Sequence, residues 1–343
     1  MIELIGDRLV FRFPEVHPRA ELSIDFQRTL RIPDDDRDHP LPPGLGCFPL
    51  RHVDDFAGRV PGRWVEHGGV MMPMYQSEAM WLHFDPAWID GNEAQYPFVI
   101  KIAAGKINAV SGEEWRDGIH RDPQDYMVAP GQPWLDGYCV QKGIIRQFVA
   151  MPLGSGYSAE EQVTGKGEHG GAQIEVFPMK REVFERRFPK RDAERARYRG
   201  MSLACLSFGE AEECAADMGL AAGGRMKQEI YDDPYDLADW DTRQRSRCFV
   251  HLCNSLVWRA ITGAEPPTTP PTAREYTAAG LPWFDYYADA PAVPGSPTLA
   301  KVKSVTQLAK EKGDKPLPEN EPVDPKNVVA IRKGLGKGQV REW

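Results

Sequence analysis

The feature that most constrains the fold of this chain is a series of short apolar runs joined by Gly and Pro turns, which extends to about residue 180. Such runs are typical of β-strands. The expected strands are Leu9–Phe13, Val70–Met74 continuing through Ala79–Phe84, Phe98–Ala103, Lys106–Val110, Tyr138–Pro152 in two pieces, and Ala172–Phe177. Ala104-Gly105 is a hairpin-sized connection, and no regular strand-helix-strand alternation is visible. We therefore expect an antiparallel, sandwich- or barrel-like N-terminal half.

From residue 181 the pattern becomes helical. The clearest helix is expected over Thr242–Thr262, because its apolar residues recur on one stripe and Gly263 follows as a natural stop. The other expected helical segments are Arg181–Arg199, interrupted at Pro189, a helix that starts at the capping-box spacing Ser207–Glu210 and ends before Gly219, and a helix that starts at Thr272–Glu275 and ends at Gly280.

A Pro-rich connector and tail complete the chain. Their composition favours an extended backbone, with Asn327–Arg332 as a candidate last strand. The sequence thus predicts an α+β protein with a β-rich antiparallel domain (1–180), a mainly helical part packed on it (181–287) and an extended Pro-rich C-terminal arm (288–343). Such an arm lies either on its own body or on a neighbouring subunit.

Composition excludes several classes of protein. The 343 residues are 41% hydrophobic and 27% charged, which is the profile of a folded chain and not of a disordered one. The formal charge of −8 argues against nucleic-acid binding, because that binding depends on Lys and Arg displacing counterions from phosphates. No apolar run reaches the roughly 18 residues that would indicate a membrane span.

The cysteines and the first residues indicate a compartment. The six cysteines include no C-x-x-C pair and lie in apolar surroundings, which is typical of buried free thiols in a reducing environment. The N-terminus lacks the basic start and the continuous apolar core of a secretory signal. We therefore expect a cytoplasmic protein.

The stretch Thr164–Gly171, TGKGEHGG, matches the nucleotide fingerprint G-x-G-x-x-G. A dinucleotide site needs a strand before the glycines and a helix after them, because the helix N-terminus binds the pyrophosphate. Here the capping-box spacing at Ser158 predicts a helical turn before the loop, and Ala172–Phe177 predicts a strand after it. Glu168 inside the loop would also repel phosphate. We therefore expect a β-loop and no bound cofactor.

The same loop carries a candidate for metal binding or acid–base chemistry. Glu168 and His169 are adjacent, and histidine both titrates near neutrality and binds metals. His67, which precedes another Gly-Gly pair, would complete a metal-ligand set with them if the two loops meet in space. The carboxylates that begin at Asp232 could contribute to the same site. The alternative is that these residues form a polar loop tip and a helix start without chemistry.

The segment Cys248–Cys253 contains two thiols and an imidazole. On the expected helix, His251 and Cys253 would point about 200° apart, so they could not share one ion. We expect Cys253 to pack in the core. The basic stretch 180–199 and the acidic segment 232–241 form opposite charge poles, and an intramolecular or intersubunit acidic partner is the simplest interpretation of the basic one.

The densest aromatic cluster lies between Leu281 and Tyr287. The candidate binding residues are Trp283, Phe284, Tyr286 and Tyr287. These side chains either contact a partner or ligand, or seal the connector onto the core.

No motif that specifies a reaction is present, so we assign no catalytic residue. The leading hypothesis is a binding or assembly module without enzymatic activity. It would associate with itself, or with another protein, through the C-terminal arm and the aromatic cluster. The alternative hypothesis is a hydrolase or metal-dependent enzyme with a site near His67, Glu168, His169 and Asp232.

Overall fold

The structure is a computed structural model, and it describes residues 1–190, 217–286, 290–314 and 321–331. It confirms a β-rich α+β protein built on a large, mostly antiparallel sheet. The strands of this sheet are β1 (Ile2–Ile5), β2 (Arg8–Arg12), β3 (Glu21–Thr29), β4 (Asp38–His39), β5 (Gly44–Cys47), β6 (Arg51–His52), β7 (Val70–Met74), β8 (Ala79–Pro86), β11 (Phe98–Ala104), β12 (Ile107–Asn108), β13 (Met127–Ala129), β14 (Trp134–Leu135), β15 (Gly137–Gln141), β16 (Ile144–Pro152), β17 (Ala172–Pro178), β18 (Asp217–Lys227) and β19 (Ser246–Asn254).

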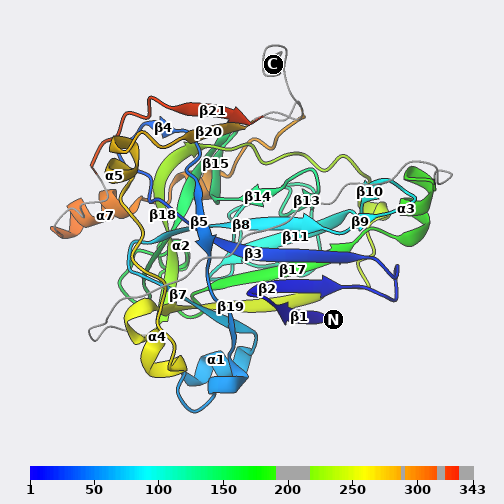
Figure 1. Ribbon diagram of the computed structural model, residues 1–343, viewed down its shortest axis with the longest axis horizontal. Coiled ribbons are helices and arrows are strands. Elements are labelled where there is room, and N and C mark those ends of the chain that lie inside the picture. Colours follow the sequence, from blue (N-terminus) through cyan, green and yellow to red (C-terminus); the bar gives the residue numbers. More distant parts are fainter. Residues whose placement is uncertain (191–216, 287–289, 315–320, 332–343) are drawn as a thin grey trace, which may run out of the picture.

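The main path through the sheet runs β1–β2–β3–β8–β16–β18–β19–β17–β11–β13. The strands β2, β3, β8, β11, β17 and β19 run across the molecule with similar axes, whereas β18 runs steeply to them (Figure 1). Two pairings are parallel, β4 with β18 and β7 with β19. The expectation of a barrel is wrong, because β1 pairs only with β2 among the described strands, so the sheet keeps an edge.

One buried cluster joins the two ends of this path. Alternate residues of β3 and β8, such as Ile24 and Leu82, enter the same core as alternate residues of β11, β17 and β19, such as Ile102, Ile174 and Val250. The period of two follows from the strand pleat, which directs successive side chains to opposite faces. The opposite face of each layer is therefore where polar and functional side chains can gather.

The hairpin between β11 and β12 confirms the connection expected near Ala104. Its two turn residues, Gly105 and Lys106, both have a positive φ, of 55° and 60°. Such angles suit the tight turns that join antiparallel strands. Glycine is also required at position 105 because a Cβ there would lie 2.3 Å from a carboxylate oxygen of Glu160.

The helix expected over Thr242–Thr262 is wrong in its first half. Ser246–Asn254 is the central strand β19, and only Ser255–Thr262 is helical, as α4. Gly263 ends α4, as expected, and does so in the left-handed conformation, while Asn254 caps its start. The error arises because β19 is buried on both faces, so its apolar residues form a continuous run that mimics a helical stripe.

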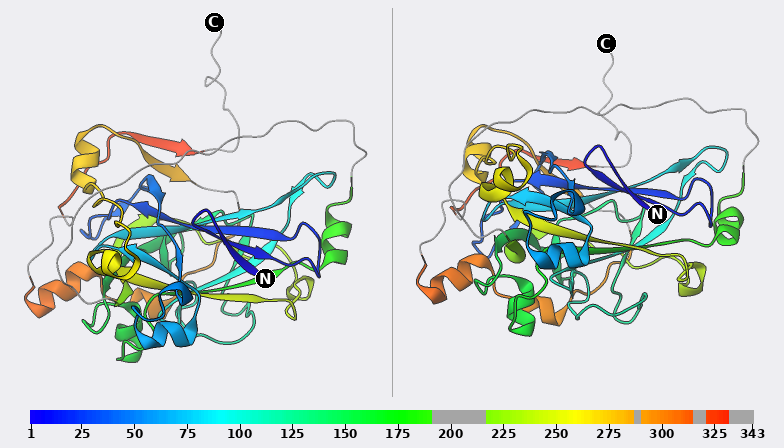
Figure 2. Two further views of the ribbon diagram at one scale, coloured as in Figure 1. Left: turned by 60° about the horizontal axis from the view of Figure 1, so that its bottom comes forward. Right: turned by 90° about the horizontal axis from the view of Figure 1, so that it is seen from below.

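The helices are interspersed along the chain and lie around the sheet (Figure 2). The remaining elements are η1 (Asp54–Phe56), α1 (Gly62–His67), β9 (Trp88–Ile89), β10 (Ala94–Gln95), α2 (Ala159–Thr164), α3 (Arg181–Arg187), η2 (Leu237–Asp239), α5 (Ala273–Ala278), β20 (Trp283–Tyr286), α6 (Pro297–Ala300), α7 (Val305–Lys312) and β21 (Val328–Ile331). The expectation that helices follow the strands is therefore wrong, since β18 and β19 complete the main sheet.

Local capping signals located several helices correctly. Ser158 and Thr272 each form the expected capping box, at the starts of α2 and α5. The helix α3 ends before Pro189, as expected. The helix expected after Ser207 lies mostly outside the described residues, but Gly219, its expected stop, lies within β18.

The described parts of the arm pack on the body of the same chain. Ser296 donates a hydrogen bond to the carbonyl of Ser111 at 2.6 Å, and α7 places Val305 against the same cluster as Val149. The expected last strand is confirmed as β21, which pairs in parallel with β20 in a separate two-stranded sheet. Within the described ranges, no helix is long and apolar enough to cross a membrane.

Candidate functional site

The GKGEHGG stretch forms a loop between α2 and β17, as expected. Three successive loop amides, those of Glu168, His169 and Gly170, donate to the carboxylate of Glu160 at 2.9, 2.8 and 2.8 Å. Converging backbone amides are a common way of holding an anion. In this chain the anion is an internal carboxylate that is only 2% exposed, so these amides have no capacity left for a phosphate.

The two loops that carry His67 and His169 meet in space. Their ring centroids lie 6.2 Å apart, and the ring centroid of His251 lies 6.4 Å from that of His67. His251 stacks on Trp64 at 4.9 Å and on Phe249 at 4.5 Å. The sequence did not predict that His251 lies beside His67, because the residue was expected on a helix. It lies instead on β19, which directs its side chain toward α1.

Burial disfavours the charged form of two of these imidazoles, those of His251 and His169. It lowers the pKa of His251 to about 4, and it also lowers the pKa of His169. The Nε2 atom of His251 lies 3.0 Å from the carbonyl oxygen of Gly68, while the Nδ1 atom of His169 is buried without a hydrogen-bond partner. The described part of the chain contains no group of three or more His, Cys, Asp or Glu residues arranged to hold a metal ion.

The other two members of the proposed enzyme site lie at the surface. Glu168 is exposed and forms an ion pair with Lys166 at 3.2 Å. Asp232 is exposed, and its amide donates to the carbonyl of Pro291 at 3.0 Å. Among the described residues, no contact joins Asp232 to His67 or His169. Asp232 is therefore apart from the histidines, whereas Glu168 adjoins His169 and acts on it electrostatically.

The two charge poles pair within the chain. Arg187 of α3 forms an ion pair with Asp239 at 2.7 Å, and Lys180 donates to the carbonyl of Ala238 at 2.7 Å. The intramolecular interpretation of the basic stretch is thus confirmed for its described residues, up to 190. Among the residues that the structure describes, Lys180, Arg186 and Arg187 contact the acidic segment of the same chain.

The described cysteines, Cys47, Cys139, Cys248 and Cys253, are free thiols. Cys253 packs in the core, as expected, but it does so from β19 and not from a helix. On a strand, residues two apart share a face, so the expected separation of His251 and Cys253 by about 200° is wrong. Cys47 is exposed, unlike the buried thiols that were expected.

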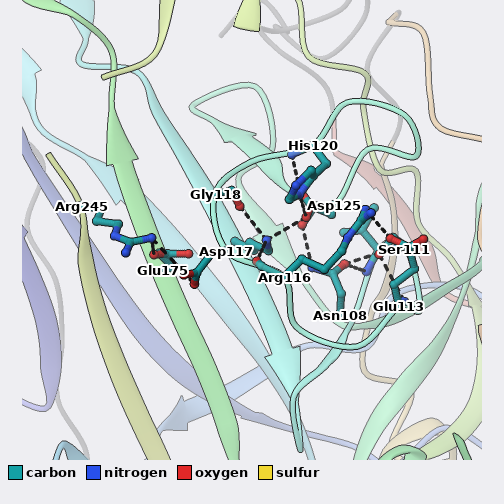
Figure 3. A network of polar contacts seen from close by, with 12 residues as sticks. Asn108, Ser111, Glu113, Arg116, Asp117, Gly118, His120, Asp125, Glu175 and Arg245 are labelled. Carbon is teal, nitrogen blue, oxygen red and sulfur yellow. Dashed lines mark hydrogen bonds and ion pairs between the residues drawn. The ribbon is translucent and has the colours of Figure 1, made fainter. Parts of the chain in front are cut away.

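A buried ionic network lies on the outer face of β11 (Figure 3). The ammonium of Lys101 donates to the carbonyls of Arg116 and Gly118 at 2.6 and 2.7 Å and pairs with Asp125 at 2.8 Å. Asp125 also lies 2.9 Å from Nδ1 of His120. All three ammonium protons are therefore engaged, and the network fixes the loop after β12. A lysine inside the apolar run FVIKIAA was the signal that could have revealed it.

The aromatic segment divides between the core and the surface. Trp283 is fully buried and donates to Thr277 at 3.2 Å, which favours the sealing role for this residue. Phe284 and Tyr286 are partly exposed, and the Tyr286 ring lies 4.8 Å from that of Trp134. Tyr287 lies outside the described residues. The segment thus contributes two side chains to a surface that also contains residues from the sheet.

Two cavities border this segment. One, of about 190 Å³, lies where β20 meets the outer face of the sheet, and six of its lining residues are Leu41, Trp81, Trp134, Asp136, Phe284 and Ile331. The other, of about 400 Å³, lies between α5 and the segment 322–327, and Trp283 lines it.

No family model, curated protein or solved structure matches this chain. Its function must therefore be argued from its own geometry. The surface around β20 and β21 combines apolar exposure, aromatic rings and both cavities. The histidine cluster brings three imidazole rings together. No sequence pattern predicted a site at Trp81, Trp134 and Asp136, because Trp81 lies in β8, far in sequence from the other two, and the three residues match no motif.

Proposed function

We propose that this protein is a binding and assembly module that pairs with a second copy of itself through β21. The observation that carries this proposal is the exposure of β21. All four of its residues are exposed, with Val328 at 40%, Val329 at 44% and Ile331 at 42%. An exposed apolar edge strand is a template for pairing with another chain.

Only one side of the small sheet is open. On the side of β20 away from β21, the amide of Leu41 donates to the carbonyl of Phe284 at 2.7 Å, and the amide of Phe284 donates back at 2.9 Å. The outer edge of β21 has no strand partner among the described residues. Edge strands are usually protected by charged residues or proline, and Val328–Ile331 contains neither.

A second copy is the occupant that suits this edge best. Antiparallel pairing of β21 with its own copy would form a four-stranded sheet across a two-fold axis, which is the commonest symmetry of homo-oligomers. The chain carries a formal charge of −8, so contact between two copies is favoured at a segment that brings no like charges together. The strand β21 itself contains no charged residue.

Size-exclusion chromatography with light scattering tests this proposal. We expect the full chain to be a dimer and Val329→Lys to be a monomer, because two lysines would face each other across the new strand pair. Leu237→Lys is the matched control, since Leu237 is 40% exposed but lies on η2 beside α3. A monomeric wild-type chain, or a dimeric Val329→Lys variant, would overturn the proposal.

The contact between His67 and His169 favours a second candidate function, a hydrolase or metal-dependent enzyme at that site. The buried Nδ1 of His169 has no hydrogen-bond partner and could coordinate an ion. This candidate expects a stoichiometric transition metal in the purified protein, with loss of that metal in His169→Ala. Elemental analysis that finds no metal would remove the metal-dependent form of this hypothesis.

A further inference from the structure

We infer that the cavity bordered by Trp81, Trp134 and Phe284 binds a small organic cation of the substituted-ammonium class. This inference does not rest on assembly, because the cavity is formed within one chain. Its volume of about 190 Å³ is below the roughly 300 Å³ at which pockets for drug-sized ligands begin, so the ligand is small. The walls of the cavity and its one charged residue determine which class of ligand it can bind.

The walls present aromatic rings from three separate elements. Trp81 of β8 and Trp134 of β14 lie edge to face, with centroids 6.4 Å apart and an interplanar angle of 68°. Phe284 of β20 lines another side. The face of an aromatic ring carries partial negative charge and attracts a cation that lies over it. Rings on several sides therefore suit a cation with apolar substituents. Such a cation holds water weakly, so it can contact the rings at a smaller desolvation cost than a strongly hydrated ion.

Asp136 is the charged residue of this cavity. It is 3% exposed, and its carboxylate accepts hydrogen bonds from Gln228, at 2.6 Å, and from Trp134. In the described part of the chain, no Lys, Arg or His side chain forms an ion pair with Asp136. A buried carboxylate without a cationic partner lies next to an accessible cavity, so the charge of the site is complementary to a cation.

Other buried carboxylates of this protein have fuller sets of partners. Glu78 pairs with Arg28 at 2.7 Å, and Asp125 pairs with Lys101 at 2.8 Å. Glu160 has no cation but accepts three backbone amides. Asp136 has neither a cation nor a third donor, and it alone of these four lines a described cavity. A bound ammonium group would supply the missing partner.

The acidity of Asp136 makes binding of a cation depend on pH. Burial raises the pKa of Asp136 to about 7, so the free carboxyl is partly protonated near neutral pH. The ionised form attracts a cation more strongly. Binding is therefore expected to strengthen as the pH rises through 7 and to release a proton.

Isothermal titration calorimetry with choline chloride tests the inference. The matched probe is 3,3-dimethylbutan-1-ol, in which carbon replaces the charged nitrogen at nearly the same shape, and sodium chloride controls for ionic strength. We expect choline to bind the wild-type chain about tenfold or more tightly than the neutral alcohol. Equal affinities, or no binding of choline, would overturn the inference.

Two variants identify the groups responsible. Asp136→Asn keeps the shape of the side chain and should reduce the preference for choline over the alcohol to the part that the aromatic rings supply, whereas Trp134→Leu should weaken binding of choline. Trp88→Leu is the control for loss of a tryptophan, since Trp88 is 51% exposed and lies on β9, away from the cavity. A preference that is unchanged in Asp136→Asn overturns the role of the carboxylate. Binding of choline by monomeric Val329→Lys would separate this result from the assembly proposal.

Discussion

The carboxylate of Glu160 explains the loop that first suggested a nucleotide site. The glycine pattern was predicted correctly to be a loop, because its neighbouring elements have the wrong order for a dinucleotide fold. The partner of its amides was not predictable, since Glu160 lies within a helix signal and nothing in the sequence shows that it turns back toward residues 168–170. The loop holds an anion, but this anion belongs to the protein.

Replacing Glu160 by Gln should therefore destabilise the protein. One of its two oxygens becomes an amide group that cannot accept the loop N–H groups, and a buried donor left without a partner costs about 1–3 kcal/mol. Chemical denaturation should show a loss of this size in the free energy of unfolding. Glu168→Gln, at an exposed side chain of the same loop, should change the free energy little. Equal effects of the two substitutions would show that the cradle is not structural.

Other residue-scale contacts were predictable only in part. The hypothesis that His67 and His169 meet was correct in space, but His251 was missed because its element was predicted wrongly. Trp81, Trp134 and Asp136 approach Phe284 from more than 140 residues away in the chain, so no local pattern links them. Sites of this kind depend on strand order, which local sequence does not encode.

Local signals located elements well when they depended on neighbouring residues. The capping boxes at Ser158 and Thr272, the break before Pro189 and the strand Ala172–Pro178 were all predicted from residues within a few positions. The strand β19 was not, because burial on both faces removes the alternation by which strands are recognised. Tertiary burial therefore decided between helix and strand where the local pattern was ambiguous.

The strand β21 is unusual among the described elements because it is apolar and exposed. An edge strand normally shows alternation or charge, because one of its faces is wet. Val328–Ile331 has neither, and all of it is exposed in the single chain. Its apolar sequence is explained if a second chain covers it, so the composition of this strand supports assembly.

The whole molecule is organised around the main sheet and the small sheet of β20 and β21. The β-rich architecture was predicted from the first 180 residues, but the return of the chain into the sheet at β18 and β19 was not. The small sheet joins the main body through Leu41 and Phe284 and borders the aromatic cavity. The proposed dimer contact and the proposed ligand site are thus neighbours, and they meet at Ile331, which lies in β21 and lines the cavity.

Hydrogen exchange at single β21 amides, measured by NMR on the full chain, shows whether a second copy covers the outer edge of β21. In a parallel pair, β20 can accept hydrogen bonds from only alternate amides of β21. If a second copy covers the outer edge, the remaining amides are also protected, so we predict slow exchange at every position from Val328 to Ile331. Slow and fast exchange in alternation would show a free edge and would contradict the account.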